Sequence, residues 1–261
     1  MSATRSSSAT SLIPYYARLA KQAGFSVAKG VALPFVRGEA VKSQAHEMAF
    51  PISTYAPWRV EPGFVAAYDR VRKNTLVDIW RCYELWSLLG EIVDVPGAII
   101  EVGVWRGGSG CLMAQRATEL GFPEPVYLCD TWKGVVKTGA VDTYYRDGKH
   151  DDTSRAIVEK LVRDLGLTNV ELLQGIFPDD TADQVADDTF RLCHIDVDVY
   201  QSAADVLDWV WPKLSTNGIV VFDDYGFPAC PGIRQFVDEQ KGLDDRLVLH
   251  NLNGHGIIVK R

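Results

Sequence analysis

The stretch AIIEVGVWRGGSG, residues 98–110, decides the fold. It begins with a short apolar run, which predicts a buried β-strand, and the helical pattern that follows its glycines predicts a helix over residues 108–121. Glycines let a backbone approach a ligand closely, and the first N–H groups of a helix have no partner within the helix. The stretch therefore predicts a strand, a turn and a helix with a binding site at the turn.

Four more short β-rich runs follow, and helical patterns separate them. The runs are VYLCD (126–130), NVELLQG (169–175), FRLCHIDVDV (190–199) and GIVVFDD (218–224). The helices are expected near residues 152–165, 179–187, 201–213 and 231–240. This alternation predicts a parallel sheet that is covered by helices on both faces.

Segments on either side of these runs complete the expected fold. Residues 246–261, RLVLHNLNGHGIIVKR, hold two β runs around Asn253-Gly254, which predicts an antiparallel hairpin at the sheet edge. Residues 75–93 place apolar side chains at three- and four-residue steps, which predicts a helix. We expect an α/β, Rossmann-like sheet of seven strands, mostly parallel, with an antiparallel C-terminal hairpin and extra N-terminal helices.

Composition and charge exclude several classes of protein. Of the 261 residues, 47 % are apolar and 23 % are charged, a balance that disordered and fibrous chains lack. The net charge is 27 − 34 = −7, whereas a general nucleic-acid-binding protein needs a basic face. No apolar run approaches the roughly 20 residues of a transmembrane segment. Five scattered cysteines, without a Cys-x-x-Cys pair, predict reduced and buried thiols in a cytoplasmic protein.

The beginning of the chain differs from the rest. Residues 1–42 hold six basic residues and one acid, 6 − 1 = +5, in a chain that is acidic as a whole. Their Ser/Thr-rich start predicts disorder, and residues 12–36 predict one or two short helices. We expect an N-terminal arm over residues 1–60, which serves as a lid or a dimer contact in a homodimer, and a main domain over residues 61–261.

The ends of the first two strands indicate the kind of ligand. In an open α/β sheet, ligands bind at the carboxyl ends of the strands. Asp130 and Thr131 end the second strand, where a carboxylate can accept hydrogen bonds from ribose hydroxyls. The spacing Glu-x-Gly-x-x-x-Gly-Gly from Glu101 differs from the Gly-x-Gly-x-x-Gly that binds a pyrophosphate. An acid at Glu101 also suits an α-ammonium group and repels a diphosphate, which favours S-adenosylmethionine over NAD.

Four carboxylates follow the next two strands. Asp196 and Asp198 lie in HIDVDV, and side chains two apart on a strand point to the same face. Asp223 and Asp224 end GIVVFDD on the neighbouring strand. Carboxylates this close repel one another unless a cation neutralises them, and oxygen donors suit Mg²⁺, Ca²⁺ or Mn²⁺. Asp198 or Asp224 alone is also compatible with a helix N-cap.

Together these motifs resemble a known family. EVGVWRGGS, DTWKG, HIDVDVY, GIVVFDDYG and PGIRQFVDE are similar to segments of the macrocin/novobiocin-type sugar O-methyltransferases, and the resemblance runs from Thr75 to the C-terminus. That family consists of metal-dependent class I methyltransferases that act on sugar hydroxyls of natural products. The resemblance departs at DTWKGVVKTG, residues 130–139, which lacks the proline usual in the family.

The resemblance implies a role for each matched residue. It makes Mg²⁺ ligands of Asp196, Asp223 and Asp224, and the general base of Asp198. The S-adenosylmethionine site would comprise Thr75, Glu101, Gly103, Trp105, Arg106, Gly107, Ser109, Asp130, Thr131, Gly175, Ile176 and Asp196. The implied reaction is transfer of a methyl group to a hydroxyl, with a glycoside or sugar as the small-molecule acceptor.

Histidines offer a different base, and other functions remain open. His150 lies in the loop of residues 132–152, expected to cover the acceptor, and is the second candidate for a catalytic role. His194 is expected to be a core histidine, whereas His46, His250 and His255 have no supporting context. The alternatives are a catechol-type phenolic O-methyltransferase with the same metal site, an NAD(P)-dependent oxidoreductase, and a non-catalytic binding module. The oxidoreductase alternative lacks a Tyr-x-x-x-Lys helix.

Overall fold

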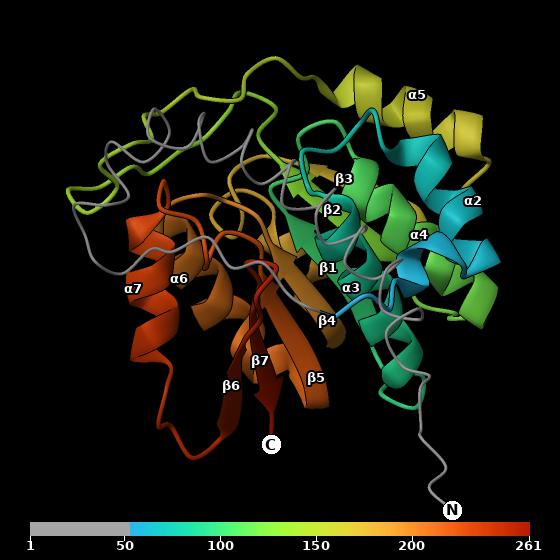
Figure 1. Ribbon diagram of the computed structural model, residues 1–261. Coiled ribbons are helices and arrows are strands. Elements are labelled where there is room, and N and C mark those ends of the chain that lie inside the picture. The colour runs from blue at the N-terminus through green and yellow to red at the C-terminus, as the bar shows by residue number, and fades with distance from the viewer. Residues whose placement is uncertain (1–52) are drawn as a thin grey trace, which may run out of the picture. The chain divides into compact units, whose positions relative to one another are not determined.

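A computed structural model describes residues 53–261, and the expected arm lies, up to residue 52, outside the described residues. The described part is built on one sheet in the order β3-β2-β1-β4-β5-β7-β6 (Figure 1). The strands are β1 (Ala98–Val102), β2 (Val126–Asp130), β3 (Val170–Gln174), β4 (Phe190–Ile195), β5 (Leu214–Phe222), β6 (Arg246–His250) and β7 (Gly256–Lys260). The first five strands pair in parallel and β7 runs antiparallel to both neighbours, so the expected seven-stranded fold is confirmed.

Helices cover both faces of the sheet. They are α2 (Pro62–Val71), α3 (Ile79–Glu91), α4 (Gly108–Leu120), α5 (Arg155–Leu165), α6 (Tyr200–Val210) and α7 (Pro231–Glu239), with 3-10 turns at Pro57–Arg59, Ala182–Val185 and Trp211–Lys213. Ile100 and Val102 point to the face that packs on α6 and α7, and Ile99 points to the face that packs on α3, α4 and α5 (Figure 1). Successive residues of a strand face opposite sides, so β1 is apolar on both.

Three expected elements differ from the observed ones. The helix expected over residues 75–93 begins at Ile79, because Asp78 caps it by accepting hydrogen bonds from the backbone N–H groups of Trp80 and Arg81. Leu76 therefore lies outside the helix and is exposed. The helix expected over 179–187 is a single 3-10 turn. The strand expected over 190–199 ends at Ile195, so the two acids that follow are not part of it.

Other expectations are confirmed. Residues 246–260 form the antiparallel hairpin, in which Phe222 of β5 pairs with Gly256 of β7. All five cysteines are free and buried. Within residues 53–261, every helix is too short or too polar to cross a bilayer.

Candidate active site

A cavity of about 280 Å³ lies at the carboxyl ends of the parallel strands. The sequence-predicted residues that line it are Thr75, Gly103, Trp105, Ser109, Asp130, Thr131, His150, Gly175, Ile176, Asp196, Asp198, Asp223 and Asp224. Three predicted residues do not line it, namely Glu101, Arg106 and Gly107. The parallel sheet thus gathers most of the candidates at one edge, as expected for an open α/β fold.

The glycines of the β1–α4 turn are required by packing within the chain. A Cβ on Gly103, whose φ is +88°, would lie 1.7 Å from the carbonyl oxygen of Asp196. A Cβ on Gly107 would contact Val158 at 2.8 Å, and one on Gly108 would meet the backbone of Asn74 at 2.7 Å. The turn is therefore held against β4, α5 and the segment before α3. Approach of a ligand is not needed to explain these glycines.

Glu101 lies behind the cavity wall. Its side chain is fully buried in β1, and its Oε1 lies 2.9 Å from Nδ1 of His194. The expectation that Glu101 contacts a bound cofactor therefore finds no support in its position, because β1 directs the carboxylate to the interior. Arg106 does not line the cavity either, since its guanidinium stacks on Trp105 and binds Asp152.

Asp130 joins the loops that follow β1 and β2 at the edge of the cavity. Its Oδ2 accepts hydrogen bonds from the backbone N–H groups of Val104 (2.7 Å) and Trp105 (2.8 Å), and its Oδ1 accepts one from Trp132 (2.6 Å). Burial raises the pKa of Asp130 above its usual value, although these three N–H groups oppose the shift. A carboxylate oxygen has two acceptor sites, so Oδ1 retains capacity for a ribose hydroxyl.

The four predicted acids converge on the floor of the cavity. Oxygen atoms of Asp196, Asp223 and Asp224 lie within 4.8 Å of one another, and the backbone N–H of Asp198 donates to Asp224 Oδ2 at 3.1 Å. The expected cause, alternation along one strand, is wrong. Asp196 and Asp198 follow β4 in a loop, where Asp198 adopts a left-handed φ of +66°, and the adjacent ends of β4 and β5 bring the acids together.

The carboxylates of this cluster differ in how well nearby positive charges and hydrogen-bond donors stabilise them. Burial, followed by repulsion from neighbouring carboxylates, raises the pKa of Asp196 and of Asp224 well above the usual range. Burial alone would also raise the pKa of Asp223, but His194, His255 and Arg81 lower it below its ordinary value. The buried guanidinium of Arg81 forms an ion pair with Asp223.

This donor set fits a divalent cation. Asp196, Asp223 and Asp224 carry three negative charges when ionised and Arg81 carries one positive charge, which leaves 3 − 1 = 2 to be balanced. All three donors are carboxylate oxygens, the ligand type that Mg²⁺ prefers. The raised pKa values of Asp196 and Asp224 indicate that these two carboxylates lack a sufficient countercharge.

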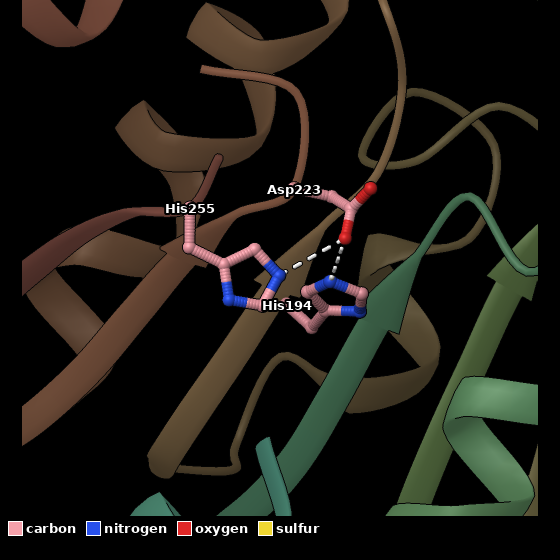
Figure 2. A group of neighbouring side chains, drawn as sticks. All are labelled: His194, Asp223 and His255. Atoms are coloured by element: carbon pink, nitrogen blue, oxygen red, sulfur yellow. Dashed lines mark hydrogen bonds and ion pairs between the residues drawn. The ribbon is translucent and has the colours of Figure 1, made fainter. Parts of the chain in front are cut away.

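His255 contributes to the site although the sequence analysis found no context for it. Its Nε2 lies 3.0 Å from Oδ1 of Asp223, and Nε2 of His194 lies 3.6 Å from the same oxygen (Figure 2). Both histidines are fully buried. His194 lies in the core as expected, but its Nε2 lacks the hydrogen-bond partner that was expected of a satisfied core histidine. The predicted hairpin contained the signal that could have identified His255. Because Gly256 pairs with Phe222, the residue before β7 lies beside the residue after β5.

The loop of residues 132–152, here called the cover loop, borders the cavity next to Asp198. The side chain of Tyr145 lies beside Asp198, whose negative charge adds to burial in raising the pKa of the tyrosine. The Tyr145 ring lies 5.8 Å from the ring of His150. Burial raises the pKa of Asp198, while Tyr145 and His150 oppose that shift. Trp105 Nε1 donates to Asp152 at 2.9 Å and thereby fixes the end of the loop.

Comparison with known proteins places the chain among O-methyltransferases. The macrocin O-methyltransferase (TylF) family matches residues 70–255. The chain is 32% identical over 186 residues to demethyldecarbamoylnovobiocin O-methyltransferase of Streptomyces niveus, a match that covers 66% of this chain and 69% of that protein. It is 30% identical over 196 residues to mycinamicin III 3''-O-methyltransferase of Micromonospora griseorubida, covering 70% and 74%.

Solved structures agree with this placement. The structure of the O-methyltransferase NovP is 27% identical, has a TM-score of 0.63, and is matched over 72% of this chain and 82% of that chain. The calicheamicin methyltransferase CalS11 is 19% identical with a TM-score of 0.58 over 80% of this chain and 99% of that chain, and shares the fold. The chain therefore belongs to the macrocin O-methyltransferase (TylF) family and is an S-adenosylmethionine-dependent O-methyltransferase.

Proposed function

We propose that the protein methylates a hydroxyl of a sugar attached to a natural product, with Mg²⁺ at the acidic floor and Asp198 as general base. The observation that carries the proposal is the convergence of four carboxylates on one cavity beside the β1–α4 turn. Named relatives support the acceptor class, because they include a novobiocin, a mycinamicin and a rhamnosyl-tetracenomycin O-methyltransferase. Membership of this family argues against the NAD(P)-dependent alternative.

The cofactor site would be formed by the turns after β1, β2 and β3. Gly103, Ser109 and Asp130 would border it, with Thr75 near the methionine end, and Gly175 and Ile176 near the adenine. Asp196, Asp223 and Asp224 would hold Mg²⁺. When bound, S-adenosylmethionine supplies an activated methyl group, and Mg²⁺ lowers the pKa of a coordinated hydroxyl.

Asp198 would accept the proton of the acceptor hydroxyl. Burial raises its pKa, which makes it a stronger base than an exposed carboxylate. The side chain of Tyr145 lies beside Asp198 and would help to orient the carboxylate. His150 borders the same cavity and would take the base role if Asp198 bound the metal instead.

The test is calorimetric titration with S-adenosylhomocysteine, with and without Mg²⁺, followed by assays with glycosides and catechols. We expect the wild type to bind S-adenosylhomocysteine and to methylate glycosides only when Mg²⁺ is present. The Asp224→Ala variant should lose the effect of Mg²⁺ and keep S-adenosylhomocysteine binding. Methylation of catechols alone would replace the sugar acceptor by the phenolic one, and full activity without Mg²⁺ would overturn the metal assignment.

A further inference from the structure

Two histidines and an aspartate converge from three neighbouring strands at one buried point. His194 lies within β4, Asp223 directly follows β5, and His255 directly precedes β7 (Figure 2). Nε2 of His194, Nε2 of His255 and a carboxylate oxygen of Asp223 all lie within 4.8 Å of one another. Asp223 also belongs to the acid cluster of the cavity floor, whereas the two histidines do not, so this cluster offers a second set of donors.

The opposite edges of both imidazole rings face carboxylates. Nδ1 of His194 lies 2.9 Å from Glu101 Oε1, and Nδ1 of His255 lies 2.6 Å from Glu84 Oε2. A carboxylate accepts a hydrogen bond and cannot donate one, so each Nδ1 carries the hydrogen. Without a cation, Nε2 of His255 can donate a hydrogen bond to Asp223 at 3.0 Å. When a cation takes the place of that proton, the neutral rings present both Nε2 lone pairs to the cation.

Glu84 is itself fixed by the hairpin turn. Its carboxylate accepts hydrogen bonds from the side-chain amides of Asn251 and Asn253 in addition to its contact with His255. The turn after β6 is thus tied to α3, and the ring of His255 is held in one orientation. Carboxylates that orient histidine ligands in this way are typical of metal centres.

Hydrogen bonds do not satisfy every polar atom of this cluster, because Nε2 of His194 has no hydrogen-bond partner. It is fully buried, and its distance of 3.6 Å from Asp223 Oδ1 exceeds that of a hydrogen bond. A buried polar atom without a partner requires an explanation. Although burial opposes the shift, Asp223 and Glu101 raise the pKa of His194 to about 9, so a proton is the competing occupant of Nε2. That proton would balance one negative charge and would leave this N–H without an acceptor at hydrogen-bond distance. One cation placed between the three atoms would bind all of them.

We propose that Nε2 of His194, Nε2 of His255 and Oδ1 of Asp223 form a site for a divalent transition-metal ion. Imidazole nitrogen favours zinc, iron, cobalt and related ions, whereas Mg²⁺ prefers oxygen. Metal–ligand bonds of roughly 2.0–2.2 Å separate neighbouring ligands by about 3 Å or slightly more, and the two nitrogens lie 3.0 and 3.6 Å from Asp223 Oδ1. Such an ion would also fix the orientation of Asp223, which the proposed magnesium site uses.

Charge balance supports a divalent ion. Glu84, Glu101 and Asp223 carry three negative charges when ionised, and the Arg81 guanidinium beside Asp223 carries one positive charge. The remainder, 3 − 1 = 2, equals the charge of the ion when both imidazoles are neutral. Asp223 and Arg81 also enter the count for the proposed magnesium site, and because their charges cancel, the two counts are compatible.

The experiment uses the full-length protein stripped of metal and loaded with Mn²⁺ in an excess of Mg²⁺. Pulsed electron paramagnetic resonance then detects nitrogen nuclei bound to Mn²⁺, and ¹⁵N-labelled histidine identifies their source. We expect coupling to two histidine nitrogens. A Mn²⁺ spectrum without nitrogen coupling would overturn the proposal even if Mg²⁺-dependent methylation were intact, whereas coupling in a protein without methylation would contradict only the proposed function.

Variants provide a second readout. Replacement of His255 with alanine should remove one nitrogen coupling and weaken Mn²⁺ binding at least tenfold. Glu84→Gln should keep both nitrogen couplings and weaken Mn²⁺ binding about 10- to 100-fold. This variant tests the proposal even if His255→Ala fails to fold. His250→Ala changes an exposed histidine of the same hairpin and should leave Mn²⁺ binding unchanged. Equal affinities in Glu84→Gln and the wild type would contradict the proposal.

Discussion

Gly103 packs directly on the carbonyl oxygen of Asp196, so the turn after β1 and the loop after β4 share one contact. A Cβ at Gly103 would lie 1.7 Å from that oxygen, and the φ of +88° is itself unfavourable for other residues. The turn after β1 and the backbone of Asp196 therefore cannot move independently. This coupling leads to the first prediction.

We expect Gly103→Ala to be more destabilising than Gly121→Ala. Gly121 also has a positive φ, +73°, but a Cβ there meets nothing within 4 Å. Both variants pay the roughly 1–2 kcal/mol of left-handed backbone strain, and Gly103→Ala adds overpacking of roughly 1–3 kcal/mol. Urea unfolding measures the difference. Equal losses of unfolding free energy would show that the contact with Asp196 relaxes without cost.

Asp198→Asn should lower kcat about 10²- to 10⁴-fold, the usual contribution of a general base. S-adenosylhomocysteine should bind as in the wild type, because the amide keeps the shape of the carboxylate. Tyr145→Phe should have a smaller effect on kcat, since it removes only a hydroxyl beside Asp198. Asp151→Asn, an exposed change in the cover loop, is the control. Unchanged turnover in Asp198→Asn would exclude Asp198 as the general base and favour His150.

Removal of metal should abolish methyl transfer. Chelation with EDTA followed by Mg²⁺ addition should restore the wild type but not Asp224→Asn at the same Mg²⁺ concentration, because Asp224 supplies one of the three clustered carboxylates. Asp187→Asn alters an exposed acid elsewhere and should recover fully. Initial rates against Mg²⁺ concentration provide the measurement, and identical curves for Asp224→Asn and the wild type would exclude Asp224 as a ligand.

Asp78 has two separable roles. Its Oδ1 caps α3 through the N–H groups of Trp80 and Arg81, and its Oδ2 binds Nε of Arg81 at 3.0 Å. Asp78→Ala should lower the unfolding free energy by about 0.5–2 kcal/mol through the lost cap. Asp78→Asn should lower it less, because asparagine also caps helices. An equal loss in Asp78→Asn would show that the ion pair with Arg81, which both variants lose, outweighs the cap.

The Asp238–Lys241–Tyr225 cluster predicts a pH dependence of stability. Lys241 and Tyr225 contact Asp238, and although burial opposes them, they lower its pKa below 3.8. A lowered folded-state pKa stabilises the protein above the unfolded value, so this contribution is complete above pH 3.8 and decreases as the pH falls below it. The melting temperature of Asp238→Asn should therefore approach that of the wild type in acid. A constant difference between the two would contradict this prediction.

Several features of this protein were predictable from the sequence because they depend on local patterns. Short apolar runs separated by helical segments gave the order of the strands along the chain, and Asn253-Gly254 marked the hairpin. Asp196, Asp198, Asp223 and Asp224 were identifiable because parallel strands end at the same edge of a sheet. The cytoplasmic location, the arm over residues 1–60 and the homodimer remain predictions.

Tertiary contacts decided the remainder. The burial of Glu101 against His194, the pairing of Arg81 with Asp223, and the place of His255 beside Asp223 each join residues more than 30 positions apart. No local pattern carries that information, because a side chain's partner depends on which strands are neighbours and in what register. The sequence by itself therefore determined the fold class and the acidic edge of the cavity. Only the packing of α3, β1, β4, β5 and β7 determined which charges meet there, since burial in a shared interior makes distant residues neighbours.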